Sequence, residues 1–180
     1  HSLAYKSEDV NVFQYFIAEG VDVNQANDEG KTALINAVHR NTPEVVAFLL
    51  EKGANVSVLD KQQKNLSYYL LKNFNPKKQE RFNQKLALLK SKGFNFSTPQ
   101  LNGNTLFHLA LDSNNLALVK YAYSLDIDVN QKNKEGISPL HIAAMKAKNT
   151  DILKYLLSIG ADKSQKTAFD ESVFDLAQEN

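Results

Sequence analysis

The sequence predicts an all-α fold, a solenoid of stacked helix-turn-helix units joined by short β-hairpin-like loops. Three observations predict this class. A unit of about 33 residues recurs along the whole chain of 180 residues. Each unit holds two short apolar stretches with helical spacing, and each ends in a glycine or another turn-forming residue. Units of this length bury their apolar faces only against their neighbours, so we expect the core to be a strip along the array.

The period follows from the spacing of equivalent residues. The turn residues that end successive units are Gly20, Gly53, Gly93, Asp126 and Gly160. The steps between them agree to within one position, except the step to Gly93, which is seven positions longer. The small position of the first helix keeps the same phase in six units: Ala4, Ala37, Leu70, Ala110, Ala143 and Ala177. We therefore predict a single domain, 1–180, with a partial repeat at 1–26, complete repeats at 27–59, 60–99, 100–132 and 133–166, and a capping half-repeat at 167–180.

The repeat at 27–59 shows why each element is expected. Gly30 suits a turn, and Thr32 suits the N-cap of a first helix whose apolar residues have helical spacing. Thr42 and Pro43 are typical of a second helix start, and Gly53 is typical of a helix end. In the half-repeat at 167–180, polar residues surround a few apolar ones, which predicts one helix with a polar outer face. The polar residues are Asp170, Glu171, Asp175, Gln178, Glu179 and Asn180.

The clearest copies of the unit are Gly30-Lys-Thr-Ala-Leu-Ile-Asn-Ala, Gly103-Asn-Thr-Leu-Phe-His-Leu-Ala and Gly136-Ile-Ser-Pro-Leu-His-Ile-Ala-Ala. The unit resembles the ankyrin repeat, whose pattern runs Gly-x-Thr-Pro-Leu-His-x-Ala-Ala, then an aliphatic helix, then Gly-Ala-Asp-Val-Asn. The resemblance implies a non-catalytic module that binds a protein partner through its concave face, using the loop tips and the exposed residues of the first helices. Matched residue by residue, that surface comprises Asp28, Glu29, Lys31, His39, Arg40, Lys61, Lys64, Lys72, Leu101, Asn102, Asn104, Asp112, Lys134, Glu135, Ile137 and Lys146.

The repeat at 60–99 departs from this pattern. Gln63 stands where the other complete repeats have glycine, and seven extra residues fall near 73–79, between the two expected helices. This repeat carries a charge of +7, whereas residues 1–59 carry −4 and residues 100–180 carry −2. One interpretation is a specialised contact surface made by Tyr68, Lys72, Phe74, Lys77 and Lys78. The other is a tolerated loop insertion with lysines that keep a helix solvated. Both stay open from the sequence.

Binding energy concentrates in few residues, often aromatic or arginine. Among the candidates we therefore favour Arg40, Leu101 and Ile137 as anchors, and Tyr68 and Phe74 if they are exposed. The basic band could instead attract an anionic polymer, which would show steep salt dependence. We expect no specific nucleic-acid binding, because the sequence pI is about 8.0 and the band contains one arginine, Arg81.

Catalytic and metal chemistry find no support in the pattern. The chain has no cysteine, and its seven glycines lie at repeat boundaries or helix ends, which leaves no phosphate-binding loop. His108 and His141 occupy the same motif position one repeat apart, and the family resemblance implies that this histidine hydrogen-bonds the backbone of the neighbouring loop. Asp126 and Asp128 fall in a turn. We expect no enzyme activity, no cofactor and no bound metal.

No apolar run approaches the length of a membrane span, so we expect no membrane insertion, and we expect a monomer. The chain begins with His1 and its first repeat lacks its beginning. We therefore expect residues upstream, where a targeting segment could lie, and the sequence leaves the compartment open. The alternative function is a structural or targeting segment of a larger protein whose activity lies upstream of residue 1.

Overall fold

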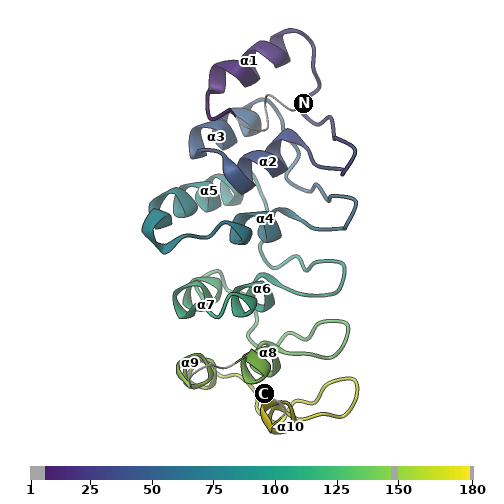
Figure 1. Cartoon of the computed structure of the whole chain (residues 1–180), viewed down its shortest axis with the longest axis vertical. Coiled ribbons are helices and arrows are strands. Elements are labelled where there is room, and N and C mark those ends of the chain that lie inside the picture. The colour runs from purple at the N-terminus through teal and green to yellow at the C-terminus, as the bar shows by residue number, and fades with distance from the viewer. Residues whose placement is uncertain (1–6, 147–149, 179–180) are drawn as a thin grey trace. The chain divides into compact units, whose positions relative to one another are not determined.

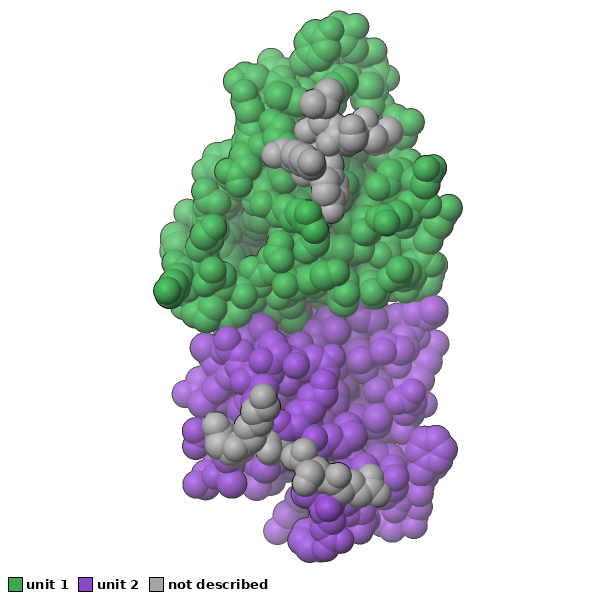
Figure 2. Space-filling model, viewed as in Figure 1, with its two compact units in different colours: residues 1–95 green, residues 96–180 purple. Residues whose placement is uncertain are grey.

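The computed structural model describes residues 7–146 and 150–178, and it forms two compact units (Figures 1 and 2). Unit 1 comprises residues 1–95 and unit 2 residues 96–180. Predictions that concern Ala4, Glu179 and Asn180 lie outside the described residues. The division between the units falls shortly before the repeat boundary expected at 99/100. That the chain is a single domain stays a prediction.

Unit 1, in its described part, alternates first and second helices of successive repeats. Its elements are α1 (Val10–Ala18), α2 (Ala33–Arg40), α3 (Pro43–Glu51), α4 (Leu66–Lys72), the 3-10 turn η1 (Pro76–Lys78) and α5 (Gln79–Ser91). First helices α2 and α4 pack on each other, and the second helices pack in the order α1, α3, α5 (Figure 1). Each repeat thus buries its apolar residues against the next, as the periodicity predicted.

Unit 2 follows the same plan. Its helices are α6 (Leu106–Asp112), α7 (Leu116–Tyr123), α8 (Pro139–Lys146), α9 (Asp151–Ser158) and α10 (Val173–Gln178). First helices α6, α8 and α10 pack in series, and α7 packs on α9. The described residues contain one isolated β-bridge, Lys166 to Ser172, and no strand, so the connecting loops are hairpin-like turns without a sheet. The fold class is all-α, of the repeat-solenoid type that the sequence predicted.

Local sequence signals set the helix ends. The Thr32 hydroxyl accepts a hydrogen bond from the backbone N–H of Ile35 at 3.3 Å, which caps α2 as expected. Thr105 and His108 form a reciprocal capping box at the start of α6. Thr42 precedes Pro43 as predicted, but its side chain makes no capping hydrogen bond at the start of α3. Gly53 follows the last turn of α3 with φ of 86°, the left-handed conformation of a helix C-cap.

The core strip is aliphatic, with small residues where first helices approach each other. Ala37, Ala110 and Ala143 are all buried, as their phase predicted. Ala177 of the same phase is exposed. Large, fully buried apolar side chains lie on both helices of the repeats: Leu34, Ile35, Leu49, Leu66 and Leu89 in unit 1, and Leu106, Phe107, Leu111, Leu118, Leu140 and Leu156 in unit 2.

The expected polar outer face of the last helix is found only in part, because Asp175 and Gln178 are exposed but an aromatic side chain is exposed as well. Phe174 occupies the repeat position of Phe107 and Leu140, which are buried, yet 68% of its surface is exposed. Phe169, at the tip of the preceding loop, is 78% exposed. Helix α10 packs on α8 through buried Leu176, whereas Phe174 points outward. The polar groups nearby serve the turn, because the Asp175 carboxylate accepts hydrogen bonds from the backbone N–H and hydroxyl of the residue that precedes the helix, Ser172.

The seven extra residues of the third repeat lie between its two helices, as predicted. They form the turn η1 and the start of α5, which is the longest of the described helices at 13 residues. Gln63 has φ of 60°, so it takes the left-handed conformation that glycine takes in the other complete repeats. The insertion therefore changes the corner between α4 and α5 and leaves the loop at 60–64 in the common pattern.

Candidate functional site

Three loop tips are each built around one acceptor side chain, Asn27, Asp60 or Asn133. The Asn27 Oδ1 atom accepts hydrogen bonds from the backbone N–H groups of Glu29 and Lys31 at 3.0 and 2.9 Å. Asp60 and Asn133 do the same at the equivalent positions of their own repeats. Such turns hold the intervening residues outward without a sheet. The tips are thus rigid supports for exposed side chains.

Neighbouring tips within a unit are tied by single backbone hydrogen bonds. The N–H of Lys61 donates to the carbonyl of Glu29 in unit 1, and the N–H of Lys134 donates to the carbonyl of Asn102 in unit 2, both at 3.0 Å. The N–H of Ala168 donates to the carbonyl of Glu135 in the same way. Each loop therefore sits at a fixed offset from the next.

The structure places the predicted contact residues in three classes of exposure. Most are exposed: Asp28, Glu29, Arg40, Lys61, Lys72, Lys77, Lys78, Leu101, Asn102, Asp112, Lys134, Glu135 and Lys146. A second group is half-buried: Lys31, Lys64, Tyr68, Phe74, Asn104 and Ile137. One, His39, is buried.

The expectation that His39 lies on a contact face is wrong, because α4 covers that side of α2. Only 7% of His39 is exposed, and its ring meets the ring of Tyr69 edge to face with centroids 5.5 Å apart. Burial lowers the pKa of His39 to about 4, helped by the positive charges of Arg40, Lys72, Lys31 and Lys85. His39 is therefore a neutral packing residue at pH 7.

In unit 1 the structure brings together a tyrosine and two lysines, which we call the Tyr68 cluster: Lys64, Tyr68 and Lys72. The Lys64 Nζ atom lies 4.3 Å from the Tyr68 ring centroid and 3.3 Å from its hydroxyl oxygen, and the Lys72 Nζ atom lies 5.5 Å from the same centroid. Burial alone would raise the pKa of Tyr68, but the two ammonium groups lower it. The cluster presents a half-exposed aromatic ring between two positive charges.

The Tyr68 cluster rests on a buried polar pair. Asp60, only 2% exposed, accepts two backbone hydrogen bonds through Oδ1 and one from the Tyr69 hydroxyl through Oδ2. Burial and the contact with Asp60 both raise the pKa of Tyr69. Because Tyr69 belongs to α4 and Asp60 to the loop, this bond fixes the loop tip on the helix that carries the cluster.

We predict that Tyr69→Phe destabilises the protein by about 1–3 kcal/mol, because the buried Asp60 carboxylate loses a hydrogen-bond donor. Urea unfolding followed by circular dichroism measures the change. The matched control is Tyr68→Phe on the same helix, which removes a half-exposed hydroxyl and should cost less than about 0.5 kcal/mol. Equal losses in the two variants would contradict this role for Tyr69.

The insertion is anchored to the rest of unit 1 by an aromatic contact and a hydrogen bond. Phe74, offered as an anchor if exposed, is half-buried and packs edge to face on Phe82 with centroids 5.0 Å apart. Asn73 donates a hydrogen bond to the carbonyl of His39 at 2.7 Å.

Lys85 of α5 is also buried, and its Nζ atom donates hydrogen bonds to the carbonyls of Ala37 and Val38 at 3.1 and 3.0 Å. It follows Phe82 and precedes Leu89 with helical spacing, and both of those residues are buried. This spacing is the sequence signal that places Lys85 on the inner side of its helix.

In unit 2 the candidate surface is joined by charge pairs and amides. Lys146 of α8 and Asp112 of α6 form an exposed ion pair at 2.6 Å. Asn133 donates to the side chain of Asn104 at 2.8 Å. Leu101 is 59% exposed, whereas the other apolar anchor named from the regular repeats, Ile137, is half-buried. Leu101 is therefore the more accessible apolar anchor of this unit.

The two motif histidines are structural. The Nδ1 atom of His108 lies 2.8 Å from the Thr105 hydroxyl, and its Nε2 atom lies 3.0 Å from the carbonyl oxygen of Ile137 in the next loop. His141 repeats the first contact with Ser138 at 2.7 Å. Burial lowers the pKa of both rings. The expected link to the neighbouring loop is confirmed for His108.

Metal-ligand groups and membrane-spanning helices were sought among residues 7–146 and 150–178, with the following result. No group of three or more His, Asp or Glu side chains in these residues has an arrangement that could hold a metal ion. No helix in the same residues is long and apolar enough to cross a bilayer.

A family model described as "Ankyrin repeats (3 copies)" matches residues 1–80 and 78–167. The chain belongs to the ankyrin-repeat family. Ankyrin repeats are in general protein–protein interaction modules and are in general non-catalytic. The family resemblance noted from the sequence is confirmed.

Two ankyrin-repeat relatives are distant in sequence and longer than this chain. The chain is 31% identical over 132 residues to ankyrin repeat protein FPV031 of Fowlpox virus, covering 72% of this chain and 37% of that protein. It is 29% identical over 171 residues to palmitoyltransferase AKR1 of Lachancea kluyveri, covering 94% of this chain and 23% of the enzyme. The chain therefore spans well under half of each of these relatives.

A solved structure shows the same ankyrin fold. It is described as the Bd0816 predatory endopeptidase from Bdellovibrio bacteriovorus in complex with immunity protein Bd3460. One chain of that structure matches with a TM-score of 0.78 and 24% identity, over 99% of this chain and 89% of the other. The similarity concerns the fold alone.

Proposed function

We propose that this chain is a non-catalytic recognition module that binds a protein partner through the loop tips and first helices, the concave face of ankyrin arrays. The observation that carries the proposal is the Tyr68 cluster, formed by α4 and the loop before it. An aromatic ring between two lysines combines an apolar contact with positive charge, and interface anchors are enriched in aromatic residues. We infer that a monomer makes this contact and that the activity is binding alone.

The supports around the cluster favour recognition by a rigid surface. The Lys64 Nζ atom is held by the Gln62 side chain at 2.7 Å as well as by Tyr68, and the buried Asp60 fixes the loop. A surface ordered before binding loses little conformational entropy when a partner docks. The loop tips should therefore bind without rearrangement.

The charge pattern favours an acidic partner surface opposite the third repeat. Residues 60–99 carry +7, with acidic repeats on either side in the sequence. Complementary charge raises the association rate and orients the encounter. Asp28 and Glu29 at the neighbouring tip would meet basic groups of the same partner, although the Glu29 carboxylate already pairs with Lys31 at 2.6 Å.

The test compares two double variants of equal charge. A partner captured from cells of the source organism is purified, and its affinity is measured for wild type, for Lys64→Glu with Lys72→Glu, and for Lys90→Glu with Lys92→Glu. The second pair changes charge by the same amount on exposed residues near the end of α5. We expect at least a tenfold loss of affinity for the first pair and less than a twofold change for the second, with roughly 1.4 kcal/mol per tenfold.

Equal losses of affinity in the two double variants would mean that only the net charge matters, and they would contradict the proposed site. Binding that persists in both would move attention to the regular tips around Leu101. Recovery of no protein would favour the alternative of a structural segment in a larger chain. A steep dependence on salt with no protein partner would favour an anionic polymer.

A further inference from the structure

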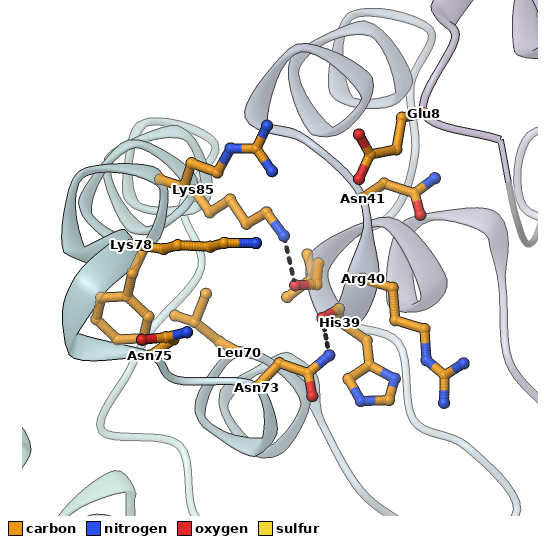
Figure 3. Close-up of a pocket in the computed structure, with 12 residues that line it drawn as sticks. Glu8, His39, Arg40, Asn41, Leu70, Asn73, Asn75, Lys78 and Lys85 are labelled. Carbon is orange, nitrogen blue, oxygen red and sulfur yellow. Dashed lines mark hydrogen bonds between the residues drawn. The ribbon is translucent and has the colours of Figure 1, made fainter.

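Unit 1 contains a pocket of about 320 Å³ at the C-terminal end of α2 (Figure 3). Its opposite wall is the corner between α4 and α5, where the seven-residue insertion lies. Figure 3 shows Lys78 and Lys85 reaching across the pocket from the side of α5, with Glu8 on the far side. The loop tips precede the first helices, at their other ends, so this pocket is separate from the loop that supports the Tyr68 cluster.

The pocket is strongly cationic. Lys78, Arg81 and Lys85 line it together with Arg40, and Glu8 is the one carboxylate among its described lining residues. His39 also lines it but is neutral at pH 7, because its pKa is lowered to about 4, by burial first. The charged side chains therefore sum to about three positive charges.

Part of this charge has a structural purpose. The C-terminal ends of α2 and α4 face the corner, and a helix end carries at most about half a negative charge. Lys85 neutralises the end of α2 directly through the carbonyls of Ala37 and Val38. Lys78, Arg81 and Lys85 exceed the charge of about one assigned to the two helix ends, even after Glu8 is subtracted. Stabilisation of the helices does not require that excess.

Lys85 gives the pocket a hydrogen-bond donor whose position is fixed by the protein. It is only 7% exposed, and two of its three N–H groups donate to backbone carbonyls, which leaves the third for a ligand. Burial lowers the pKa of Lys85 to about 8, Arg81 contributes to the same shift, and Glu8 opposes it. A bound anion would raise this pKa.

The remaining wall combines three apolar side chains, Val38, Leu70 and Phe82, with the amides of Asn41, Asn73 and Asn75. Val38 and Leu70 are nearly inaccessible, and Phe82 packs against Phe74 of the insertion. The pocket volume of about 320 Å³ is at the lower limit for small-molecule sites and exceeds what a single small ion needs. A ligand that fits carries an anionic head with an organic group attached.

We propose that this pocket, formed by Lys78, Arg81 and Lys85 around the end of α2, binds the phosphoryl group of a phosphomonoester. A phosphomonoester carries about −1.5 to −2 charges at pH 7, so the cationic lining of the pocket attracts its phosphoryl group. Arginine binds phosphate oxygens in a bidentate manner, and a buried lysine adds a point charge beneath. The insertion thus has a ligand-binding role. This proposal does not depend on the protein-recognition function of the loop tips.

Isothermal titration calorimetry and amide NMR titration test the proposal with defined probes. The probes are O-phosphoserine, a short peptide containing phosphoserine, the same peptide without phosphate, and acetate. The variants are Lys78→Gln with Arg81→Gln, both exposed residues, and the matched control Lys90→Gln with Lys92→Gln. We expect saturable 1:1 binding of a phosphorylated probe that weakens at least tenfold in the first variant and less than twofold in the control.

Two further readouts are expected. Amide shifts should concentrate at Val38, Asn73, Asn75 and Lys85, and binding at pH 8 should take up protons as the pKa of Lys85 rises. Tighter binding of free phosphoserine identifies a small metabolite as the source of the phosphoryl group, and tighter binding of the phosphopeptide identifies a modified protein side chain. Lack of saturation at about 20 mM probe, binding of acetate as tight as that of phosphoserine, or equal weakening in the two variants would overturn the proposal.

Discussion

Replacing Gly136 with alanine is expected to destabilise unit 2 by about 2–4 kcal/mol, from a backbone cost and a steric one. Gly136 has φ of 73°, and a Cβ atom built there would lie 2.6 Å from the backbone nitrogen of Ala168 and 3.0 Å from the carbonyl carbon of Thr167. The left-handed conformation alone costs alanine about 1 kcal/mol. The rest comes from the overlap, which would separate two loop tips joined by the Ala168 to Glu135 hydrogen bond.

Gly160→Ala is the matched control in the same unit. Gly160 has φ of 93° but no atom within 4 Å of a built Cβ, so only the conformational cost of about 1 kcal/mol applies. Urea unfolding of both variants, followed by circular dichroism, gives the two losses. We expect Gly136→Ala to lose clearly more unfolding free energy than Gly160→Ala. Similar losses would mean that the two loops separate at little cost.

Acidification from pH 7 to 4.5 is expected to destabilise unit 1 by about 2–3 kcal/mol through His39 alone. In the unfolded chain His39 titrates near 6.5, whereas its pKa in the folded protein is about 4 because of burial and the positive charges of Arg40, Lys72, Lys31 and Lys85. Between these values the unfolded state binds a proton that the folded state does not. Stability therefore falls as the pH falls through this window.

The variant His39→Phe isolates this contribution. Phenylalanine can keep the edge-to-face contact with Tyr69 and cannot titrate. The difference in unfolding free energy between pH 7 and 4.5 should be smaller in the variant by about 2–3 kcal/mol. His108 and His141, whose pKa values are also lowered by burial, remain in both proteins and cancel in the comparison. Parallel pH curves for the two proteins would show that His39 takes up its proton without cost.

The repeat frame could be predicted from the sequence because its signals are local. Period, capping and turn residues each act within a few positions, so the boundaries near Thr32 and Gly53 follow from the residues themselves. The exposed tips, such as Asp28 and Lys134, follow for the same reason. These features require no knowledge of how one helix sits on another.

The candidate sites depend on such packing and could be predicted only in part. His39 is buried because α4 packs on that side of α2. The apolar residues Ala37 and Val38 predict a buried face of α2, but they do not predict that this face extends to His39. Lys85 stands in an apolar row, where a long cationic chain is not expected without knowledge of the helix end that it meets. The exposure of Phe174 was not predicted for a related reason. Its repeat position is apolar in most units, and the sequence does not show whether another helix covers that position.

The placement of the insertion has a consequence for how repeat proteins acquire new chemistry. Within each unit, neighbouring loop tips must keep a strict offset because a backbone hydrogen bond ties them together, but the corner between α4 and α5 lies outside these bonds. Lengthening the chain there costs little closure entropy and leaves the frame unchanged. In protein engineering terms, this corner is a grafting position, where a few residues can add a binding cavity to an existing scaffold without a redesign of its stacking.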